Sequence, residues 1–254
     1  MLIVERQQRV LNILKLRKTV QLEELAQELD VSSSTIRRDL EHLESRGKVD
    51  RTRAGAIYRE SVDEPNVDEA GRMNEQIEQK QAIASVAAQL VQPHMTVLMD
   101  GGSTVVYTAQ QVIARPIQVV TNSLLIASHF VEDDKVELVM IGGDLYPRTG
   151  TTVGAIATGC LADLHADLLL FSLAGIYDQE AYNINLPMTQ VEQVMMRQAA
   201  KNILLMDSTK FGRKSLVRVC GLNEVDQIIT DAHVGLDWKQ RLDTQIRVAE
   251  PYAQ

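Results

Sequence analysis

The chain has 254 residues, of which 45% are hydrophobic and 24% charged, a composition typical of globular proteins with one small and one medium domain. Its longest apolar runs, 136–141 and 203–206, are far too short to span a membrane, and residues 1–10 are too polar for a secretory signal. The two cysteines, Cys160 and Cys220, favour free thiols in a reducing cytoplasm over a disulfide scaffold, with a single bridge between them as the alternative.

Charge is divided unevenly along the chain. Residues 1–60 contain 12 Lys and Arg against 10 Asp and Glu, whereas residues 61–254 contain 14 against 24, which together give the net charge of −8. Six basic residues of the first segment fall within 17 positions: Arg37, Arg38, Arg46, Lys48, Arg51 and Arg53. A small basic segment before an acidic body suits a DNA-binding domain joined to a domain with another function.

Three helices are expected in the N-terminal segment. The first, residues 4–17, carries apolar side chains at helical spacing, and a short connector at 19–22 leads into the second helix, residues 22–29. Ser32 is expected to cap the third helix, because its hydroxyl can accept a hydrogen bond from a backbone N–H of the first turn. Gly47 is expected to end that helix.

Residues 48–51 and 54–58 are expected to form two strands of a wing, which completes a winged helix-turn-helix over residues 1–60. The third helix begins with hydroxyls and two arginines at the end where a helix-turn-helix meets base edges. Arginine pairs with guanine, and serine and threonine contact phosphates or bases. The predicted DNA contacts, including wing arginines on phosphates, are Ser33, Ser34, Thr35, Arg37, Arg38, Lys48, Arg51 and Arg53. The alternative is that Arg37 and Arg38 are only a solvated helix face.

Residues 61–74 are acidic, contain Pro65 and Gly71, and have no periodic apolar pattern, so they are expected to be a linker. In residues 75–254, amphipathic segments alternate with short buried runs, which is typical of a mostly parallel α/β sheet covered by helices. The expected strands are 96–99, 117–120, 136–141, 168–172, 203–206 and 227–230. Ligands of such sheets bind beyond the carboxyl ends of the strands, so the loops at those ends are the candidate site.

Four of these strand ends carry polar, mostly glycine-containing loops. Ser103, Thr104 and the N–H groups of the following helix start can bind an anion, and the missing Walker lysine argues against a nucleoside triphosphate. Because only 4% of residues are aromatic, a shared pocket here suits a small phosphorylated sugar or polyol rather than a flat base. The predicted effector-binding residues are Asp100, Gly101, Gly102, Ser103, Thr104, Thr121, Asn122, Ser123, Gly142, Gly143, Gly154 and Lys210. The alternative is that these loops are ordinary turns and helix caps.

Two sets of motifs resemble one family. The run Val31-Ser32-x-x-Thr35-Ile36-Arg37-Arg38-Asp39-Leu40 closely resembles the helix-turn-helix signature of the DeoR family of bacterial sugar-metabolism regulators. Further segments match, in order, motifs of that family's C-terminal sensor domain: 100–104, 121–123, 142–143, 150–154, 208–211 and 229–231. The resemblance extends over roughly residues 1–235 and implies a body similar in fold to ribose-5-phosphate isomerase.

The resemblance also implies roles for individual residues. Ser103, Thr104, Thr121 and Asn122 would hold a phosphate or sugar hydroxyls, and Lys210 would approach the ligand. Departures from the family pattern are Arg53-Ala54 in place of His-Gly in the wing, Gln79 in place of a glutamate, and an altered effector loop at 177–185. A ligand role and a surface position remain alternatives for Arg72, Asn74, Lys80 and Glu192.

These features predict a transcriptional regulator of the cytoplasm, a repressor of a sugar-catabolic operon whose affinity for double-stranded operator DNA depends on a phosphorylated sugar or polyol. A homodimer or higher oligomer is expected, because one small DNA-binding domain buries too little surface for high specificity. The protein is not expected to be an enzyme, and no catalytic residue, metal, cofactor or membrane partner is expected. The alternatives are a sugar-phosphate isomerase with a DNA-binding head and a DNA-binding oligomer whose body senses nothing.

Overall fold

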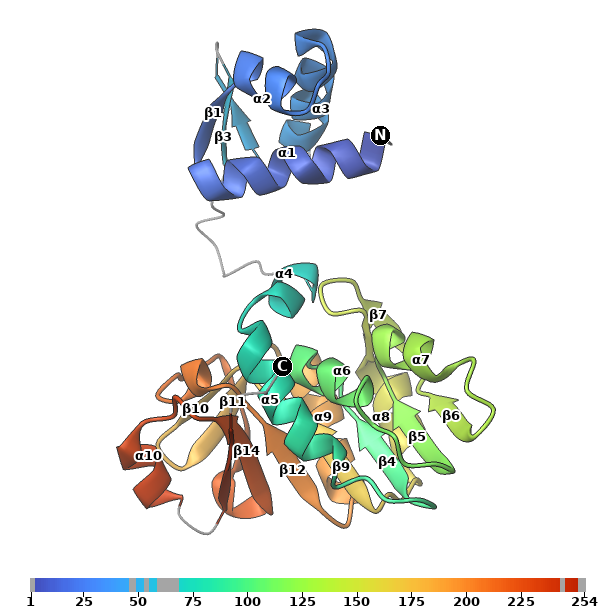
Figure 1. Ribbon diagram of the computed structural model, residues 1–254. Coiled ribbons are helices and arrows are strands. Elements are labelled where there is room, and N and C mark those ends of the chain that lie inside the picture. Colours follow the sequence, from blue (N-terminus) through green and yellow to red (C-terminus); the bar gives the residue numbers. More distant parts are fainter. Residues whose placement is uncertain (1–2, 46–48, 53–54, 59–68, 243–244, 251–254) are drawn as a thin grey trace. The chain divides into compact units, whose positions relative to one another are not determined.

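The computed structural model describes residues 3–45, 49–52, 55–58, 69–242 and 245–250. The chain forms two compact units, Met1–Asn66 and Val67–Gln254, which we call the head and the body. The elements of the head, shown in blue in Figure 1, are α1 (Ile3–Arg17), β1 (Thr19–Gln21), α2 (Leu22–Glu28), α3 (Ser33–Ser45), β2 (Val49–Arg51) and β3 (Gly55–Tyr58).

The head is stabilised by one apolar core between its helices and its small sheet. Val10 and Leu14 of α1, Leu25 of α2, and Ile36 and Leu40 of α3 are all buried in this core. Their spacing of three or four residues within each helix produces the apolar stripe that each helix needs in order to pack. The predicted helix-turn-helix is therefore confirmed.

One segment of the head differs from the prediction. Residues 19–21, expected to be part of a connector, form strand β1, which pairs antiparallel with β3 in a sheet of order β1-β3-β2. Val20 is buried and its two neighbours in the strand are exposed. A single inward side chain is too short a pattern to identify a strand from sequence.

The body begins with two helices and continues as alternating strands and helices (Figure 1). Its helices are α4 (Glu69–Asn74), α5 (Ile77–Ala88), α6 (Ser103–Ala109), α7 (Leu124–Phe130), α8 (Gly154–Ala162), α9 (Leu186–Gln198) and α10 (Leu236–Arg241), with short 3-10 turns η1 (Ser208–Lys210) and η2 (Leu222–Glu224). Its strands are β4 (Thr96–Met99), β5 (Ile117–Thr121), β6 (Val136–Met140), β7 (Asp144–Tyr146), β8 (Thr151–Val153), β9 (Leu168–Phe171), β10 (Gly175–Tyr177), β11 (Glu180–Asn183), β12 (Asn202–Leu205), β13 (Val217–Gly221), β14 (Gln227–Asp231) and β15 (Ile246–Ala249).

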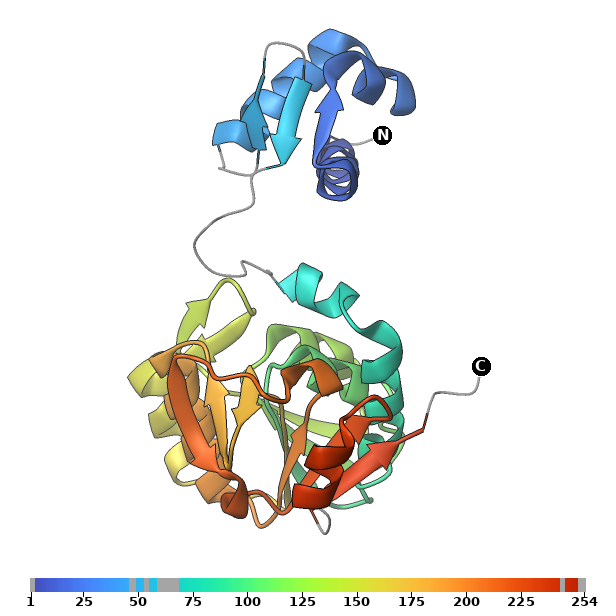
Figure 2. The ribbon, with the colours of Figure 1, turned by 90° about the vertical axis from the view of Figure 1, so that its left-hand side faces the viewer.

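Seven strands form the central sheet, in the order β15-β14-β12-β9-β4-β5-β6, and every neighbouring pair is parallel. The chain builds outward from β4 through β5 to β6 and then returns to place β9 on the other side of β4. The strand order therefore reverses between β4 and β9, and this reversal is where doubly wound sheets bind ligands. Figure 2 views the body from the end where β15, in red, forms the edge of the sheet.

Helices cover both faces of this sheet, and each face has its own core (Figures 1 and 2). Val97 and Met99 of β4 pack with α5, α6 and α7, whereas Leu98 packs with α8 and α9 on the opposite face. Successive strand residues point to opposite faces, so a strand buried on both sides is a nearly continuous run of apolar residues. The predicted α/β fold with a parallel sheet is confirmed.

One boundary differs from the sequence prediction. Residues 69–74, placed in the expected linker 61–74, form α4. Helix α9 begins at Leu186, where the Asn185 Oδ1 atom accepts a hydrogen bond from the backbone N of Met188 at 2.9 Å and caps the helix.

Candidate functional site

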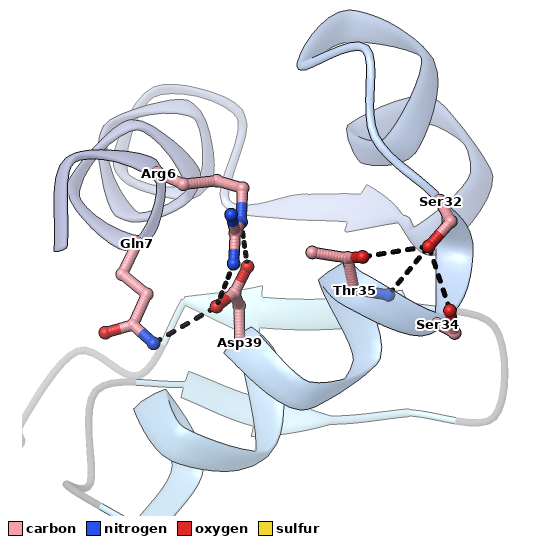
Figure 3. Close-up of polar contacts among 6 residues, drawn as sticks. All are labelled: Arg6, Gln7, Ser32, Ser34, Thr35 and Asp39. Carbon is pink, nitrogen blue, oxygen red and sulfur yellow. Dashed lines mark hydrogen bonds and ion pairs between the residues drawn. The ribbon is translucent and has the colours of Figure 1, made fainter. Parts of the chain in front are cut away.

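The third helix of the head begins at a cluster of hydroxyls (Figure 3). The Ser32 Oγ atom accepts a hydrogen bond from the backbone N of Thr35 at 3.2 Å, so Ser32 caps α3 as predicted. The same oxygen lies 2.9 Å from the Ser34 hydroxyl and 2.8 Å from the Thr35 hydroxyl. Ser33 and Ser34 are exposed. The N-terminal end of α3 is therefore fixed in place and presents hydroxyls to solvent.

The two faces of α3 separate cleanly. Ile36, Leu40 and Leu43 are buried, whereas Arg37 and Arg38 are exposed. This is the arrangement that a recognition helix requires, with base-reading side chains free to enter a major groove. Contact of these arginines with DNA remains a prediction.

A buried carboxylate joins α3 to α1 (Figure 3). The Asp39 side chain is 3% exposed and forms an ion pair with Arg6, whose Nε lies 2.6 Å from Oδ2. The second carboxylate oxygen accepts hydrogen bonds from Arg6 Nη2 at 3.2 Å and from Gln7 Nε2 at 3.1 Å. We call this set the Asp39 clamp. It holds the recognition helix against the first helix from the side away from Arg37.

The wing arginine Arg51 is bound by carboxylates of α3. Glu44 accepts hydrogen bonds from the Arg51 backbone N at 3.3 Å and from its Nε at 2.8 Å, and Glu41 accepts one from Nη1 at 2.8 Å. The expected phosphate contact of Arg51 is therefore accompanied by an intramolecular role that the sequence did not reveal. Predicted contacts Lys48 and Arg53, and the expected helix end at Gly47, lie outside the described residues.

Glu44→Gln is expected to lower DNA affinity about threefold, because it weakens the bonds that hold β2 against α3, and exposed ion pairs are worth at most about 1 kcal/mol. Glu41→Gln is the matched control, since Glu41 contacts only one guanidinium nitrogen, and it should have a smaller effect. Fluorescence anisotropy with labelled duplex measures both. A gain in affinity for Glu44→Gln would show instead that this carboxylate only repels DNA.

In the body, the loop after β4 lies at the reversal of strand order. The Asp100 Oδ2 atom accepts hydrogen bonds from the backbone N of Gly102 at 3.2 Å and of Ser172, after β9, at 3.3 Å. A Cβ atom on Gly101 would lie 2.0 Å from Thr151 Cγ2, and one on Gly102 would lie 2.6 Å from Ser172 Cβ. The close packing of neighbouring loops requires glycine at both positions, and their predicted contact with an effector stays a prediction.

The loop after β5 packs against the same region. Thr121 donates its hydroxyl hydrogen bond to the Met99 carbonyl at 2.7 Å, and Ser123 caps α7. Asn122 donates from Nδ2 to the Thr152 carbonyl at 2.9 Å, but its Oδ1 atom is buried and has no hydrogen-bond partner among the described residues. Of the three predicted residues, Asn122 has the acceptor best placed for a ligand, because buried polar atoms are nearly always paired.

The remaining predicted glycines lie around the β7–β8 hairpin. Gly143 has a φ of +143°, and a Cβ there would lie 2.6 Å from the Val153 carbonyl oxygen. Gly154 has a φ of +87° and lies beside Asp144, whereas a Cβ atom added to Gly142 would meet only Ile156 Cγ2, at 3.9 Å. The positive φ angles of Gly143 and Gly154 explain why glycine occupies these two positions.

Glu192 of α9 is buried, so its alternative as a surface carboxylate is wrong. Its Oε1 atom accepts a hydrogen bond from Asn183 Nδ2, and its Oε2 atom has no partner among the described residues. Burial, followed by the charge of nearby Asp100, raises the pKa of Glu192 well above its usual value, and burial also raises the pKa of Asp100. Glu192 falls within the apolar stripe of α9 next to Val191 and Met195, a sequence signal that could have revealed its position.

Glu192→Gln is expected to stabilise the body by roughly 1–3 kcal/mol at pH 8, because it removes a buried carboxylate that lacks a second partner. Folding raises the pKa of Glu192, so the native state binds the carboxyl proton more tightly than the unfolded state does. This proton binding stabilises the native state fully below the unfolded-state pKa, and the stabilisation is lost as pH rises from there through the native-state pKa. Melting temperatures should converge near pH 4, and equal curves at all pH values would contradict the assignment.

A group of cations lies around Lys80, and one of them, Arg72, also acts on Asp100. Lys80 of α5 is buried, and burial lowers its pKa to about 8, with Asp207 and Lys210 among its charged neighbours. Arg72 of α4 interacts electrostatically with Asp100 and with Lys80. A surface position for Lys80 is therefore excluded. We call Asp100, Asn122, Glu192, Lys80, Arg72, Asp207 and Lys210 the carboxyl-edge cluster.

Two surface hollows, with volumes of about 330 and 300 Å³, lie along α9. Gln193 and Arg197 line both of them, and none of their lining residues belongs to the carboxyl-edge cluster. Of the predicted effector residues, Thr121 and Ser123 are fully buried.

Both cysteines are free thiols, so the alternative of a Cys160–Cys220 bridge is wrong; burial raises the pKa of Cys220 to about 12. Among the described residues, no helix has the length and apolar character required to cross a membrane. The same part of the chain contains no group of three or more acidic, histidine or cysteine side chains arranged to hold a metal ion.

Comparison with known proteins identifies the family of both the head and the body. A family model for the DeoR-like helix-turn-helix domain matches residues 6–62, and one for the DeoR C terminal sensor domain matches residues 75–232. The L-fucose operon activator of Escherichia coli (strain K12) is 32% identical over 229 residues, covering 89% of this chain and 94% of the activator. The HTH-type transcriptional repressor GlcR of Bacillus subtilis (strain 168) is 31% identical over 227 residues, covering 89% and 88%. A solved ribose 5-phosphate isomerase A from Methanocaldococcus jannaschii is 15% identical, with a TM-score of 0.37, and covers 52% of this chain and 53% of its own.

Proposed function

The chain belongs to the DeoR family of transcriptional regulators, and we propose that it represses a sugar-catabolic operon in the cytoplasm and releases its operator when a phosphorylated sugar or polyol binds the body. The observation that carries this proposal is the pairing, within one chain, of an exposed recognition helix and a polar cluster at the strand-order reversal of a parallel sheet.

The chemistry of the carboxyl-edge cluster supports a ligand with both an anionic group and hydroxyls. Lys80, Arg72 and Lys210 supply positive charge suited to a phosphate. Glu192 and Asn122 each have a buried oxygen without a partner among the described residues, and such oxygens accept hydrogen bonds from hydroxyl groups. A phosphorylated sugar or polyol presents both kinds of group.

A homodimer or higher oligomer is part of the proposal. One small head contacts too few base pairs for high specificity, and paired heads read two half-sites about one helical turn apart. An operator with two such half-sites, and a mass in solution of at least twice that of the chain, are the expected findings.

Gel-shift titration tests the function directly, with the DNA upstream of the chain's own gene and a panel of phosphorylated sugars and polyols. We expect specific binding without ligand and release by one member of the panel. Absence of sequence-specific binding under all conditions would overturn the proposal. Binding that no panel member alters would favour a body that senses nothing, and turnover of ribose 5-phosphate would favour the isomerase.

A further inference from the structure

Helix α8 lies at the surface of the body but has the sequence of a buried helix. Residues 149–162, which include all of α8, contain no charged residue. One side of the helix is buried through Ala157 and Leu161, whereas Ile156 is 62% exposed. Because a helix that is apolar on all sides is normally buried on all sides, the exposed side of α8 lacks a covering element in the single chain.

We call this exposed side, which consists of Ala155, Ile156, Gly159 and Cys160, the α8 face. A Cβ atom added to Gly159 would meet no atom within 4 Å among the described residues, so packing within the chain does not require glycine there. Glycine inside a helix costs about 0.5–1 kcal/mol relative to alanine. Close approach of a helix from another molecule offsets this cost, because two helix backbones come close together only over small residues.

Two opposite charges without partners flank the α8 face. Arg197 of α9 lines the hollow of about 330 Å³ that is also lined by Ala155, in the first turn of α8. Asp163 caps the other end of α8 and is exposed. Neither side chain has a hydrogen bond or an ion pair with another described residue. The two charges therefore lie near opposite ends of the same helix.

We propose that the α8 face is the contact between the bodies of two copies of this chain, whose α8 helices cross antiparallel about a two-fold axis near Gly159. In this arrangement Asp163 of each copy lies in the hollow beside Arg197 of the other, so each charge gains the ion-pair partner that it lacks in the single chain. The inference rests on the homodimer of the proposed function and names its interface.

A second copy fits this face better than an unrelated partner does. A two-fold contact joins a surface patch to itself, so the patch must be self-complementary. The α8 face meets this condition, because its centre is uncharged and opposite charges lie near its two ends. Residues 61–254 contain 14 Lys and Arg against 24 Asp and Glu, so two bodies repel each other and approach most easily where charge is absent.

Analytical ultracentrifugation of the full chain tests the contact at Ile156. We expect Ile156→Glu to raise the dissociation constant of the dimer roughly tenfold or more, because it places an unpaired carboxylate in an apolar contact. Ile113→Glu makes the same change at an isoleucine that is 92% exposed and lies outside the α8 face, and it should leave the dimer unchanged. Circular dichroism spectra show whether both variants are folded.

A charge exchange tests the orientation of the two helices. Asp163→Arg and Arg197→Asp should each weaken the dimer, because each places two like charges together across the interface, and the double variant should regain most of the lost affinity. A short bismaleimide should also link Cys160 of one copy to Cys160 of the other, and Cys160→Ser should abolish the product because Cys220 is buried.

The outcomes separate this inference from the proposed function. A wild type that is monomeric at all concentrations would overturn the homodimer itself. A wild-type dimer that Ile156→Glu leaves intact, or a double charge variant that binds no better than the single variants, would overturn only the α8 interface.

Discussion

Asp39→Ala is expected to destabilise the head by about 2–3 kcal/mol and to abolish specific DNA binding. The Asp39 clamp joins α3 to α1 through a side chain that is 3% exposed and an arginine that is 13% exposed. Removing one partner of a fully buried ion pair costs about 3–5 kcal/mol, and the partial exposure of Arg6 reduces that figure. The loss leaves Arg6 and Gln7 with donors that face an apolar methyl group.

Hydrogen exchange of α1 in the full chain measures this effect without isolating the head. A loss of 2–3 kcal/mol corresponds to roughly 30- to 150-fold faster exchange of its protected amides. Asp39→Asn keeps the volume and one acceptor and should show an intermediate effect. Glu23→Ala, which removes an exposed carboxylate of α2, is the control and should change stability by less than about 0.5 kcal/mol. Equal exchange in Asp39→Ala and Glu23→Ala would show that the clamp contributes nothing.

The central strands could be predicted from sequence because both of their faces are buried. Residues 97–99 and 168–171 are uninterrupted apolar runs, and their burial on two sides explains why no alternation appears. The antiparallel strands β10, β11 and β13 could not be predicted. They are short, and exposed side chains such as Tyr177 interrupt the apolar pattern, so their pairing depends on contacts made only in the folded chain.

The carboxyl-edge loops could be located from sequence, but the roles of their residues could not. The rule that ligands bind beyond strand ends identified the loops around Asp100 and Asn122. It could not distinguish hydroxyls that hydrogen-bond within the protein, such as that of Thr121, from oxygens that have no partner among the described residues, such as Asn122 Oδ1. Lys80 and Glu192 were harder still, because lysine and glutamate are usually exposed and only the fold shows that both are buried.

The head shows the same limit for arginines. Arg37 and Arg51 are equivalent as basic residues in the sequence, but Arg51 is bound by two carboxylates of α3. The sequence separations of those pairs, seven and ten residues, give no local signal, because the wing must fold back onto the helix first. Charge counting alone therefore overestimates how many guanidinium groups are open to DNA.

Arg37→Ala is expected to weaken binding to operator DNA by about 1–3 kcal/mol, or roughly 5- to 150-fold, if Arg37 reads a base. The arginine is exposed near the N-terminal end of α3, and bidentate pairing with guanine is the commonest specific contact of arginine in a major groove. Binding to random duplex should weaken far less, because a lost base contact costs nothing where the correct base is absent. Arg17→Ala removes the same charge from an exposed arginine paired with Glu28 and is the control.

Titration at several salt concentrations separates the two roles that Arg37 could have. A base contact predicts a large loss on operator DNA with a nearly unchanged slope of log affinity against log salt. A phosphate contact predicts equal losses on operator and random duplex and a slope smaller by about one, because one fewer counterion is released. If Arg37 only lies on the solvated face of α3 and does not contact DNA, Arg37→Ala should cause the same small loss on every duplex that Arg17→Ala causes. The comparison thus decides whether α3 reads sequence through Arg37 or whether specificity comes from the neighbouring hydroxyls and Arg38.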